Sequence, residues 1–278
     1  AEIPPLAAGA ENYATVGVAM QDGRFTVYFQ PKINLRTGAL SGAEALVRGL
    51  DEDGTIIPPA QFIEYLEEAG MIRDLDLFVL DQSLAQADQW RAAGLGIVPV
   101  AVNLSRETLV HPSTLASILA IQSRYPDIPT SALELEITER GGGIEASEFR
   151  AIAERFHDCG LRLSLDDFGS QYANMPLFTS VKFDAVKIDR SLILDLADNP
   201  IGQALVQDIV QICRTHHMNC VAEGVETREQ LDVLRKMDCP CAQGFYYDRP
   251  LPANVFEEKY LQGRASVVQW QQNEEEQT

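Results

Sequence analysis

The sequence contains few basic residues and no long apolar run. Only 22 lysines and arginines stand against 41 aspartates and glutamates, so the formal net charge of the 278 residues is -19. This balance lacks the basic footprint of a protein that binds polymeric nucleic acid, and it disfavours contact with an anionic membrane surface. No apolar stretch approaches the roughly 20 residues that cross a bilayer, and no signal peptide is visible. We therefore expect a cytoplasmic chain, or the cytoplasmic part of a larger, membrane-anchored protein.

Cysteine and histidine are equally scarce. The five cysteines are odd in number and form no C-x-x-C pair, which argues against a disulfide framework and favours a reducing compartment. The four histidines show no metal-ligand spacing. Any metal in this protein is therefore expected to have oxygen ligands. A bound cation would also let so acidic a protein act on a small phosphate ester, because the ion supplies the positive charge locally.

Both ends of the chain differ from its centre. Residues 1–13 carry two prolines and little periodicity, which predicts a linker. Residues 262–278 are rich in glutamine and glutamate, which predicts a flexible tail. Residues 14–261 contain no Pro-, Gly- or Ser-rich break, and a chain that is 46% hydrophobic can form one large core. We expect a single domain over 14–261.

Short β-type runs alternate with longer helical patterns along this domain. We predict strands over 25–30, 42–48, 97–104, 132–137, 161–166, 183–188, 218–222 and 241–246. We predict helices over 60–69, 74–92, 113–123, 146–158, 202–215 and 227–236. This alternation predicts an α/β fold, a TIM-like (β/α)8 barrel. A doubly wound open sheet would give a similar pattern, so the alternation by itself leaves both architectures open.

Most of the predicted strands carry an acidic, amide or lysine residue inside them or at their exit. In chain order these residues are Glu44, Asn103, Glu136, Asp166, Asp167, Lys187, Glu223 and Gln243. Each has an ordinary explanation on its own, since a lone glutamate at a strand end is usually solvated and paired aspartates usually form an Asx turn. Together they are costly, because carboxylates inside strands must be paired or coordinated. In a parallel barrel all strand ends share one face, so we expect these residues to converge on one pocket.

The expected ligands are carboxylates and one amide, which favour Mg²⁺ or Mn²⁺ and disfavour zinc. Asp166 and Asp167 add a geometric clue. Consecutive strand residues point to opposite faces, so both carboxylates can reach one centre only where the pleat ends. One of them can then bridge two ions about 3.5–4 Å apart.

Several motifs resemble those of one known family. Glu44-Ala45-Leu46 lies within GAEALVR, which resembles the signature of the EAL-domain cyclic di-GMP phosphodiesterases. The other motifs are YFQPKI with Gln30, VNLS with Asn103, LEITE with Glu136 and Glu139, Asp166-Asp167-Phe168-Gly169, VKIDR with Lys187, AEGVE with Glu223 and Glu226, and AQGFYYDRP with Gln243 and Phe245. The resemblance runs from about Phe25 to Leu251, nearly the whole ordered chain. The letters EAL alone would mean nothing, but the ordered set is highly specific.

The resemblance implies a TIM-like barrel that forms a homodimer, binds two Mg²⁺ or Mn²⁺ ions per site and hydrolyses cyclic di-GMP to linear pGpG. By motif, Glu44, Asn103, Glu136 and Asp166 would bind one ion, while Asp166 and Asp167 would serve the second. Glu223, Lys187 and Gln243 would position or activate the attacking water. Gln30, Leu46, Arg48 and Phe245 would contact the cyclic dinucleotide. Glu139 and Glu226 would anchor loops, and family habit adds a tandem sensor or cyclase domain in a longer chain.

One segment departs from the family pattern. After the aspartate pair and Phe168-Gly169 the family usually continues with glycine, an aromatic residue and two serines, whereas this chain has Ser170-Gln171-Tyr172-Ala173-Asn174. A left-handed backbone at Gln171 would cost roughly 1 kcal/mol or more. An alternative function is therefore a receptor that binds cyclic di-GMP with weak or no turnover. A third possibility is another metal-dependent barrel enzyme of enolase-like type, which the AEGVE and AQGF motifs disfavour.

Overall fold

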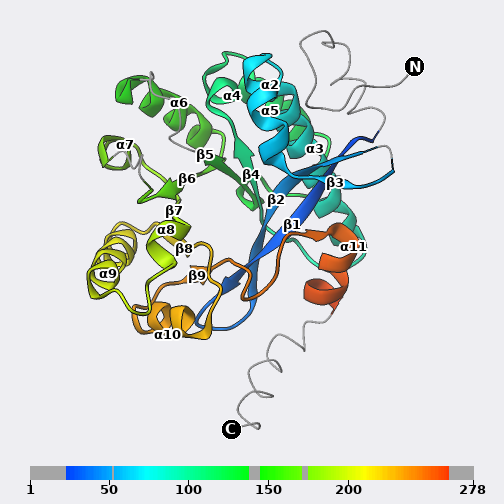
Figure 1. Cartoon of the computed structure of the whole chain (residues 1–278). Coiled ribbons are helices and arrows are strands. Elements are labelled where there is room, and N and C mark those ends of the chain that lie inside the picture. Colours follow the sequence, from blue (N-terminus) through cyan, green and yellow to red (C-terminus); the bar gives the residue numbers. More distant parts are fainter. Residues whose placement is uncertain (1–22, 52, 138–144, 171–174, 263–278) are drawn as a thin grey trace.

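Eight strands close into a ring with helices on its outside (Figure 1). The computed structural model describes residues 23–51, 53–137, 145–170 and 175–262. Around the ring the strands follow the order β2, β4, β5, β6, β7, β8, β9 and β1, and a β1–β2 pairing closes it. The closed ring confirms the TIM-like barrel and excludes the open sheet. No helix in the described ranges is both long enough and apolar enough to cross a bilayer.

The strands of the ring lie close to their predicted positions. They are β1 (Phe25–Asn34), β2 (Leu40–Leu50), β4 (Val100–Leu104), β5 (Leu133–Ile137), β6 (Arg162–Phe168), β7 (Ala185–Ile188), β8 (Asn219–Ala222) and β9 (Cys241–Ala242). Two short strands extend the sheet, β3 (Ile56–Ile57) on β2 and β10 (Leu251–Pro252) on β1. The last ring strand is shorter than the predicted 241–246, because the chain turns after Ala242.

The helices that cover the ring also follow the predicted order. They are η1 (Pro59–Gln61), α2 (Ile63–Glu68), α3 (Ile72–Ala92), α4 (Arg106–Val110), α5 (Thr114–Gln122), η2 (Thr130–Ala132), α6 (Ala146–Asp158), α7 (Met175–Ser180), α8 (Arg190–Ile193), α9 (Pro200–Thr215), α10 (Arg228–Lys236), α11 (Ala253–Phe256) and the π-helical turn η3 (Glu257–Gln262). Local sequence explains several of their starts. The side chain of Asn199 caps α9, whose first residue is Pro200, and Thr227 and Gln230 form a capping box at α10.

The first strand runs opposite to the others, which corrects the expectation of an all-parallel ring. β1 pairs antiparallel with both β2 and β9, while β2 and β4 through β9 pair in parallel. A short turn joins β1 to β2, in which the side chain of Asn34 accepts hydrogen bonds from the N–H groups of Arg36 and Thr37. Parallel strands need a crossover of a dozen or more residues, so a connection this short permits only a hairpin.

The two faces of the barrel wall have opposite character, because side chains alternate along a strand. The outward face packs under the helices, as where Phe29 of β1 meets Trp90 of α3 edge-on with ring centroids 4.9 Å apart. The inward face carries charged side chains. Lys32 of β1 contacts Glu134 and Glu136 of β5, which lies three strands away around the ring, so these side chains cross the interior. The barrel interior is therefore polar, and its charges must balance one another.

Candidate active site

Lys187 of β7 lies at the centre of the predicted site. Its Nζ atom lies 2.7 Å from Oε2 of Glu136 and 3.0 Å from Oδ1 of Asp166. The same atom lies 2.8 Å from Oε1 of Glu223 and 3.4 Å from Oε2 of Glu44. These carboxylates come from β2, β5, β6 and the end of β8, so residues almost 180 positions apart converge as predicted. Lys187 is only 1% exposed, and a lysine can be buried in this way because four carboxylates surround it.

An amide network surrounds Glu44. Asn103 of β4 donates from Nδ2 to Oε1 of Glu44 over 2.9 Å. Gln243 donates from Nε2 to Oε2 of Glu44 over 2.6 Å and to Oε1 of Gln30 over 2.9 Å. Because the Gln243 amide nitrogen faces a carboxylate, its oxygen must point the other way. That oxygen, Oε1, is buried and accepts no hydrogen bond from the described residues, so an acceptor is left for a bound molecule.

The backbone at Asp167 brings two consecutive carboxylates to one side. Asp167 has φ +55, and the register between β6 and β7 shifts between Leu165 and Phe168. This irregularity ends the pleat at the predicted place. Carboxylate oxygens of Asp166, Asp167 and Glu223 consequently lie within 4.8 Å of one another. A positive φ at a residue other than glycine costs roughly 1–2 kcal/mol, and such strain is typical of functional sites.

The crowded charges shift the pKa values of the cluster. Burial acts to lower the pKa of Lys187, but the neighbouring carboxylates outweigh burial and raise this pKa well above its ordinary value. Burial raises the pKa of Glu136 to about 7, and the charge of Glu44 adds to the effect. Burial likewise raises the pKa of Glu223 well above its ordinary value. Glu44 differs, since the charges of Lys187 and Lys32 and two amide hydrogen bonds overcome its burial and lower its pKa to about 2. Raised carboxyl pKa values beside a buried lysine indicate a site that additional cations would stabilise.

Close backbone packing brings the AEGVE and AQGF segments together. A Cβ atom at Gly244 would lie 2.2 Å from the carbonyl oxygen of Val225, so only glycine fits there. Val225 N–H donates to the carbonyl of Gln243, and Tyr246 N–H donates to the carbonyl of Val225. The contact places Gln243 beside the strand end that carries Glu223. Glu226, a predicted loop anchor, pairs over 2.8 Å with Arg190 at the start of α8.

The predicted ligand contacts follow the hairpin outward from Glu44. Gln30 faces Glu44 across the β1–β2 pair, and Leu46 and Arg48 are the next residues of β2 with the same orientation. Arg48 is half-buried, and its guanidinium carbon lies 5.6 Å from the ring centroid of Tyr28. Gln30 is buried and already hydrogen-bonded, since it donates to the carbonyl of Asp248 and accepts from Gln243. Its direct contact with a ligand stays a prediction.

Phe245, the other predicted ligand contact, is 45% exposed. The guanidinium of Arg249 lies over its ring, 4.1 Å from the centroid. A cation on an aromatic face is favourable and fixes the ring plane. Glu139 and the segment Gln171–Asn174 lie outside the described residues, so the predicted loop anchor and the departure from the family pattern stay predictions.

Two buried charged residues belong to this region although the sequence analysis did not select them. Lys32 lies beneath Glu136, with Nζ 2.7 Å from its Oε1. Asp76 of α3 accepts from Ser105 N–H over 2.8 Å and from the Thr108 hydroxyl over 2.6 Å, directly after the strand that carries Asn103. Both carried a signal in the sequence. Lys32 shares a strand face with Gln30, and Asp76 falls within the apolar stripe of its helix.

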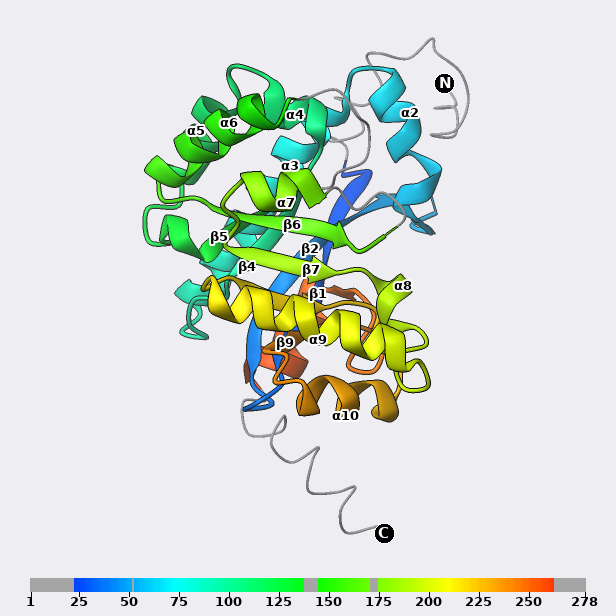
Figure 2. The same cartoon turned by 90° about the vertical axis from the view of Figure 1, so that its left-hand side faces the viewer.

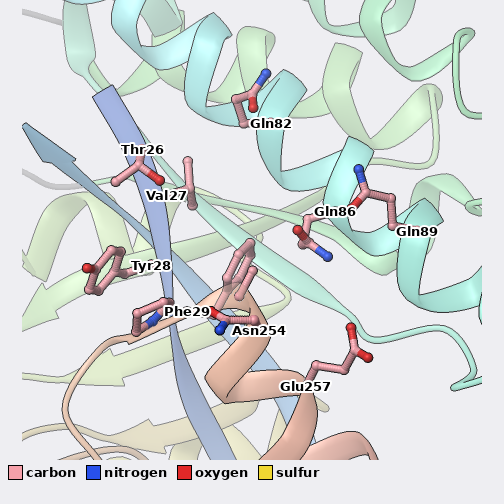
Figure 3. A pocket seen from close by; sticks show the side chains of 11 residues that line it. Thr26, Val27, Tyr28, Phe29, Gln82, Gln86, Gln89, Asn254 and Glu257 are labelled. Atoms are coloured by element: carbon pink, nitrogen blue, oxygen red, sulfur yellow. The ribbon is translucent and has the colours of Figure 1, made fainter. Parts of the chain in front are cut away.

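A cavity of about 450 Å³ lies outside the barrel wall, between β1, α3 and α11 (Figure 3). Side-chain amides of Gln82, Gln86 and Gln89 line it from α3, and Asn254 lines it from the opposite helix. None of the predicted site residues contributes to this cavity, so it is separate from the carboxylate cluster.

Comparison with known proteins identifies a single family. The family model of the EAL domain matches residues 14–250. A protein of Pseudomonas aeruginosa named cyclic di-GMP phosphodiesterase PA2567 is 32% identical over 227 residues, which are 82% of this chain and 38% of that protein. The Escherichia coli protein named cyclic di-GMP phosphodiesterase PdeR is 31% identical over 243 residues, 87% of this chain and 36% of that protein. The chain thus spans little more than a third of the length of these curated relatives.

A solved structure agrees with the sequence comparison. The structure titled PaMucR phosphodiesterase, c-di-GMP complex, is 32% identical to this chain and superposes with a TM-score of 0.80. The superposition covers 87% of this chain and 98% of that one. An EAL domain protein of Listeria monocytogenes gives a TM-score of 0.76 at 27% identity, over 91% of this chain and 99% of that one.

Proposed function

Because the chain belongs to the EAL domain family, we propose that it is a metal-dependent phosphodiesterase that hydrolyses cyclic di-GMP to linear pGpG. One observation carries the proposal, namely the convergence of four strands' carboxylates on Lys187 at the barrel mouth. Relatives named cyclic di-GMP phosphodiesterases and a fold shared with a c-di-GMP complex support the choice of substrate.

The donor set fits a hard divalent cation. Asp166, Asp167 and Glu223 offer oxygens within 4.8 Å of one another, and Glu44 and Asn103 add a carboxylate and an amide nearby. We propose two Mg²⁺ or Mn²⁺ ions per site, with Glu44, Asn103, Glu136 and Asp166 for one ion and Asp166 and Asp167 for the other. When bound, such ions lower the pKa of water and stabilise the oxygens of an in-line displacement at phosphorus.

The chain's own side chains supply the remaining steps. The Lys187 ammonium group offsets negative charge that develops on the phosphate oxygens. The free Oε1 of Gln243 accepts a hydrogen bond from the attacking water and orients it. Glu223 is the base that takes the proton of that water, since its carboxylate lies close to both Lys187 and the aspartate pair. Asn103 and Gln243 hold Glu44 in place through their amide nitrogens.

The substrate would lie along the hairpin and against the loop after β9. Arg48 supplies a positive group on this path, and Leu46, two residues earlier on the same face of β2, offers an apolar contact. Phe245 presents an exposed ring that a guanine can stack on, and stacking on an aromatic side chain is worth about 1–3 kcal/mol per base. Gln30 contributes through its contact with Gln243.

We also propose that two copies associate through the outer face of α9, which is turned toward the viewer in Figure 2. Ile201, Leu205 and Ile212 form one stripe along this helix and are 82%, 44% and 41% exposed. Leu194, directly after α8, is also 51% exposed. Exposed apolar side chains that share one face of a surface helix are a candidate protein interface. The cytoplasmic location and a tandem sensor or cyclase domain stay predictions.

The decisive experiment is incubation of the purified chain with cyclic di-GMP and Mg²⁺ or Mn²⁺, followed by chromatography of the nucleotides. We expect pGpG, and we expect Asp167→Asn and Glu44→Ala to abolish its formation. Tight binding of cyclic di-GMP without pGpG would overturn the enzyme and establish the receptor alternative. If both variants hydrolysed at the rate of the wild type, the assigned metal site would be wrong.

A further inference from the structure

Lys32 is a second buried lysine in the barrel. It contacts the proposed metal ligand Glu136 from the side of the barrel where β5 begins. Its Nζ atom lies 2.7 Å from Oε1 of Glu136 and 3.2 Å from Oε1 of Glu134. Glu134 precedes Glu136 by two residues on β5, toward the beginning of the strand. Lys187 lies on the other side, where it contacts Asp166 and Glu223 at the strand ends. Glu136 is therefore enclosed between two ammonium groups.

The two oxygens of Glu136 are divided between these lysines. Oε1 faces Lys32, and Oε2 faces Lys187, which also contacts the other carboxylates of the cluster. Glu136 is 0% exposed and Lys32 is 6% exposed, so water does not compete for either contact. A charge-assisted hydrogen bond of this length in an enclosed site is strong and fixes the rotamer of both partners. The carboxylate therefore cannot turn its second oxygen toward the cluster.

The positive charge of Lys32 is compensated by a carboxylate that lies outside the proposed metal site. Glu134 contacts Lys32 through Oε1, and its Oε2 lies 3.5 Å from the guanidinium of Arg162. This arrangement forms a chain of alternating charges from the barrel mouth inward, through Lys187, Glu136, Lys32, Glu134 and Arg162. Lys32 can thus hold Glu136 permanently, because its own charge is compensated by a carboxylate outside the proposed ligand set.

We propose that Lys32 is a positioning residue, which holds Oε1 of Glu136 from beneath and so presents Oε2 as a single-oxygen ligand to the divalent cation. The inference rests on the proposed metal site, but it concerns a residue outside the predicted ligand set. Partners that orient a metal ligand commonly change metal affinity about 10- to 100-fold when they are removed.

Positioning and simple electrostatics predict opposite signs for Lys32→Met and different results for Glu134→Gln. If Lys32 acted only as a nearby positive charge, Lys32→Met would strengthen Mn²⁺ binding and Glu134→Gln would weaken it. If Lys32 positions Glu136, Lys32→Met weakens Mn²⁺ binding by about 10- to 100-fold, and Glu134→Gln leaves it nearly unchanged. Lys32→Gln keeps a donor without the charge, so its loss should be smaller than that of Lys32→Met.

The test is calorimetric titration of the full chain with MnCl₂, for the wild type, the three single variants and the double variant Lys32→Met/Glu134→Gln. The double variant removes one positive and one negative charge together, so it keeps the buried charges balanced if the single variant fails to fold. We expect it to bind Mn²⁺ as weakly as a folded Lys32→Met variant does. Unchanged or tighter Mn²⁺ binding in the double variant would overturn the positioning role.

The wild type separates this inference from the proposed function. If it binds Mn²⁺ but forms no pGpG, the proposed enzyme fails while the titrations still decide the role of Lys32. If it binds neither Mn²⁺ nor Mg²⁺, both proposals are wrong. A circular-dichroism melt of each variant shows whether a weak titration reflects loss of the fold.

Discussion

The Nζ atom of Lys187 and Oε2 of Glu136 lie 2.7 Å apart, and neither side chain is more than 1% exposed. Both side chains are removed from water, so each buried charge is stable only while its partner is present. Asp166, Glu223 and Glu44 share the same ammonium group. Four carboxylates thus share the single ammonium group of Lys187, and Lys32 adds a second positive charge at Glu136.

Removal of this lysine should make the fold depend on divalent cations. Without metal, we expect Lys187→Met to lower the free energy of unfolding by about 3–5 kcal/mol, because it leaves buried carboxylates unpaired. Mn²⁺ should recover part of the loss, since it supplies the missing charge and binds only the folded state. Urea denaturation with and without MnCl₂ measures both effects. Lys259→Met is the control, because Lys259 also forms an ion pair, with Asp248, but its side chain is 53% exposed. Equal losses in the two variants would contradict the central role of Lys187.

Substitution of Asp167 by glycine should preserve stability but abolish function. Its φ of +55 suits glycine, so we expect Asp167→Gly to unfold at the same free energy or at one higher by up to about 1 kcal/mol. The same variant should lose Mn²⁺ binding and hydrolysis, because it removes a proposed ligand. Asp167→Ala, which has neither the carboxylate nor the freedom of glycine, is the control and should be the less stable variant. A marked loss of stability in Asp167→Gly would show that the carboxylate, and not the backbone, holds this turn.

Asp76 should make stability depend on pH. Its pKa rises from 3.8 to about 6, chiefly through burial, while hydrogen bonds from Ser105 and Thr108 oppose the shift. A carboxyl group with a raised pKa in the folded state binds its proton more tightly there than in the unfolded chain, so its contribution to stability increases as the pH falls through this window.

The comparison with Asp76→Asn isolates this term. The wild type should gain about 1 kcal/mol relative to the variant when the pH is lowered from 7 to 5. Urea denaturation of both proteins at the two pH values gives the difference. The difference in free energy of unfolding between the wild type and Asp76→Asn should change between pH 7 and pH 5. If it stays constant, or favours the variant at pH 5, the Asp76 carboxyl does not have a raised pKa.

The stripe on α9 should control the oligomeric state. We expect the wild type to sediment as a dimer and Leu205→Glu to sediment as a monomer, because a charge in an apolar interface loses its hydration without a partner. Ile97→Glu is a matched control, since Ile97 is 45% exposed and Leu205 is 44% exposed, but Ile97 lies before β4 and away from the stripe. A monomeric wild type, or a dimer that survives Leu205→Glu, would exclude this surface as the interface.

The fold was predictable from the sequence because its signal is repetitive. Alternating strand and helix patterns indicated the ring strands, whereas closure was left open by the alternation and was implied by the family resemblance; the β1–β2 pairing shows it. The reversal of β1 was missed, although the connection between the strand at 25–30 and the strand at 42–48 is too short for a helical crossover. The length of the connection between the two strands therefore indicates their relative direction, whereas hydrophobic periodicity does not.

The site was predictable as a set of residues but not as a network. Polar residues at strand ends identified Glu44, Glu136 and the aspartate pair, because strand ends of a barrel share one face. The pairing of Lys32 with Glu136 joins positions 104 residues apart across the interior, and no local pattern encodes such a contact. The end of the pleat at the aspartate pair was predicted, but the left-handed backbone of Asp167 was not, because it depends on packing.

The reversed first strand decides where the polypeptide enters the barrel. In an all-parallel barrel the first strand begins at the end opposite the catalytic face. Here β1 descends from the mouth, since Thr26 pairs with Arg48 near the end of β2 and Asn34 pairs with Cys241 at the start of β9. The chain therefore arrives at residue 25 beside the opening through which a substrate must pass. A conformational change ahead of β1 would therefore act directly at the open end of the barrel that carries the site. It would not have to be transmitted from the opposite end.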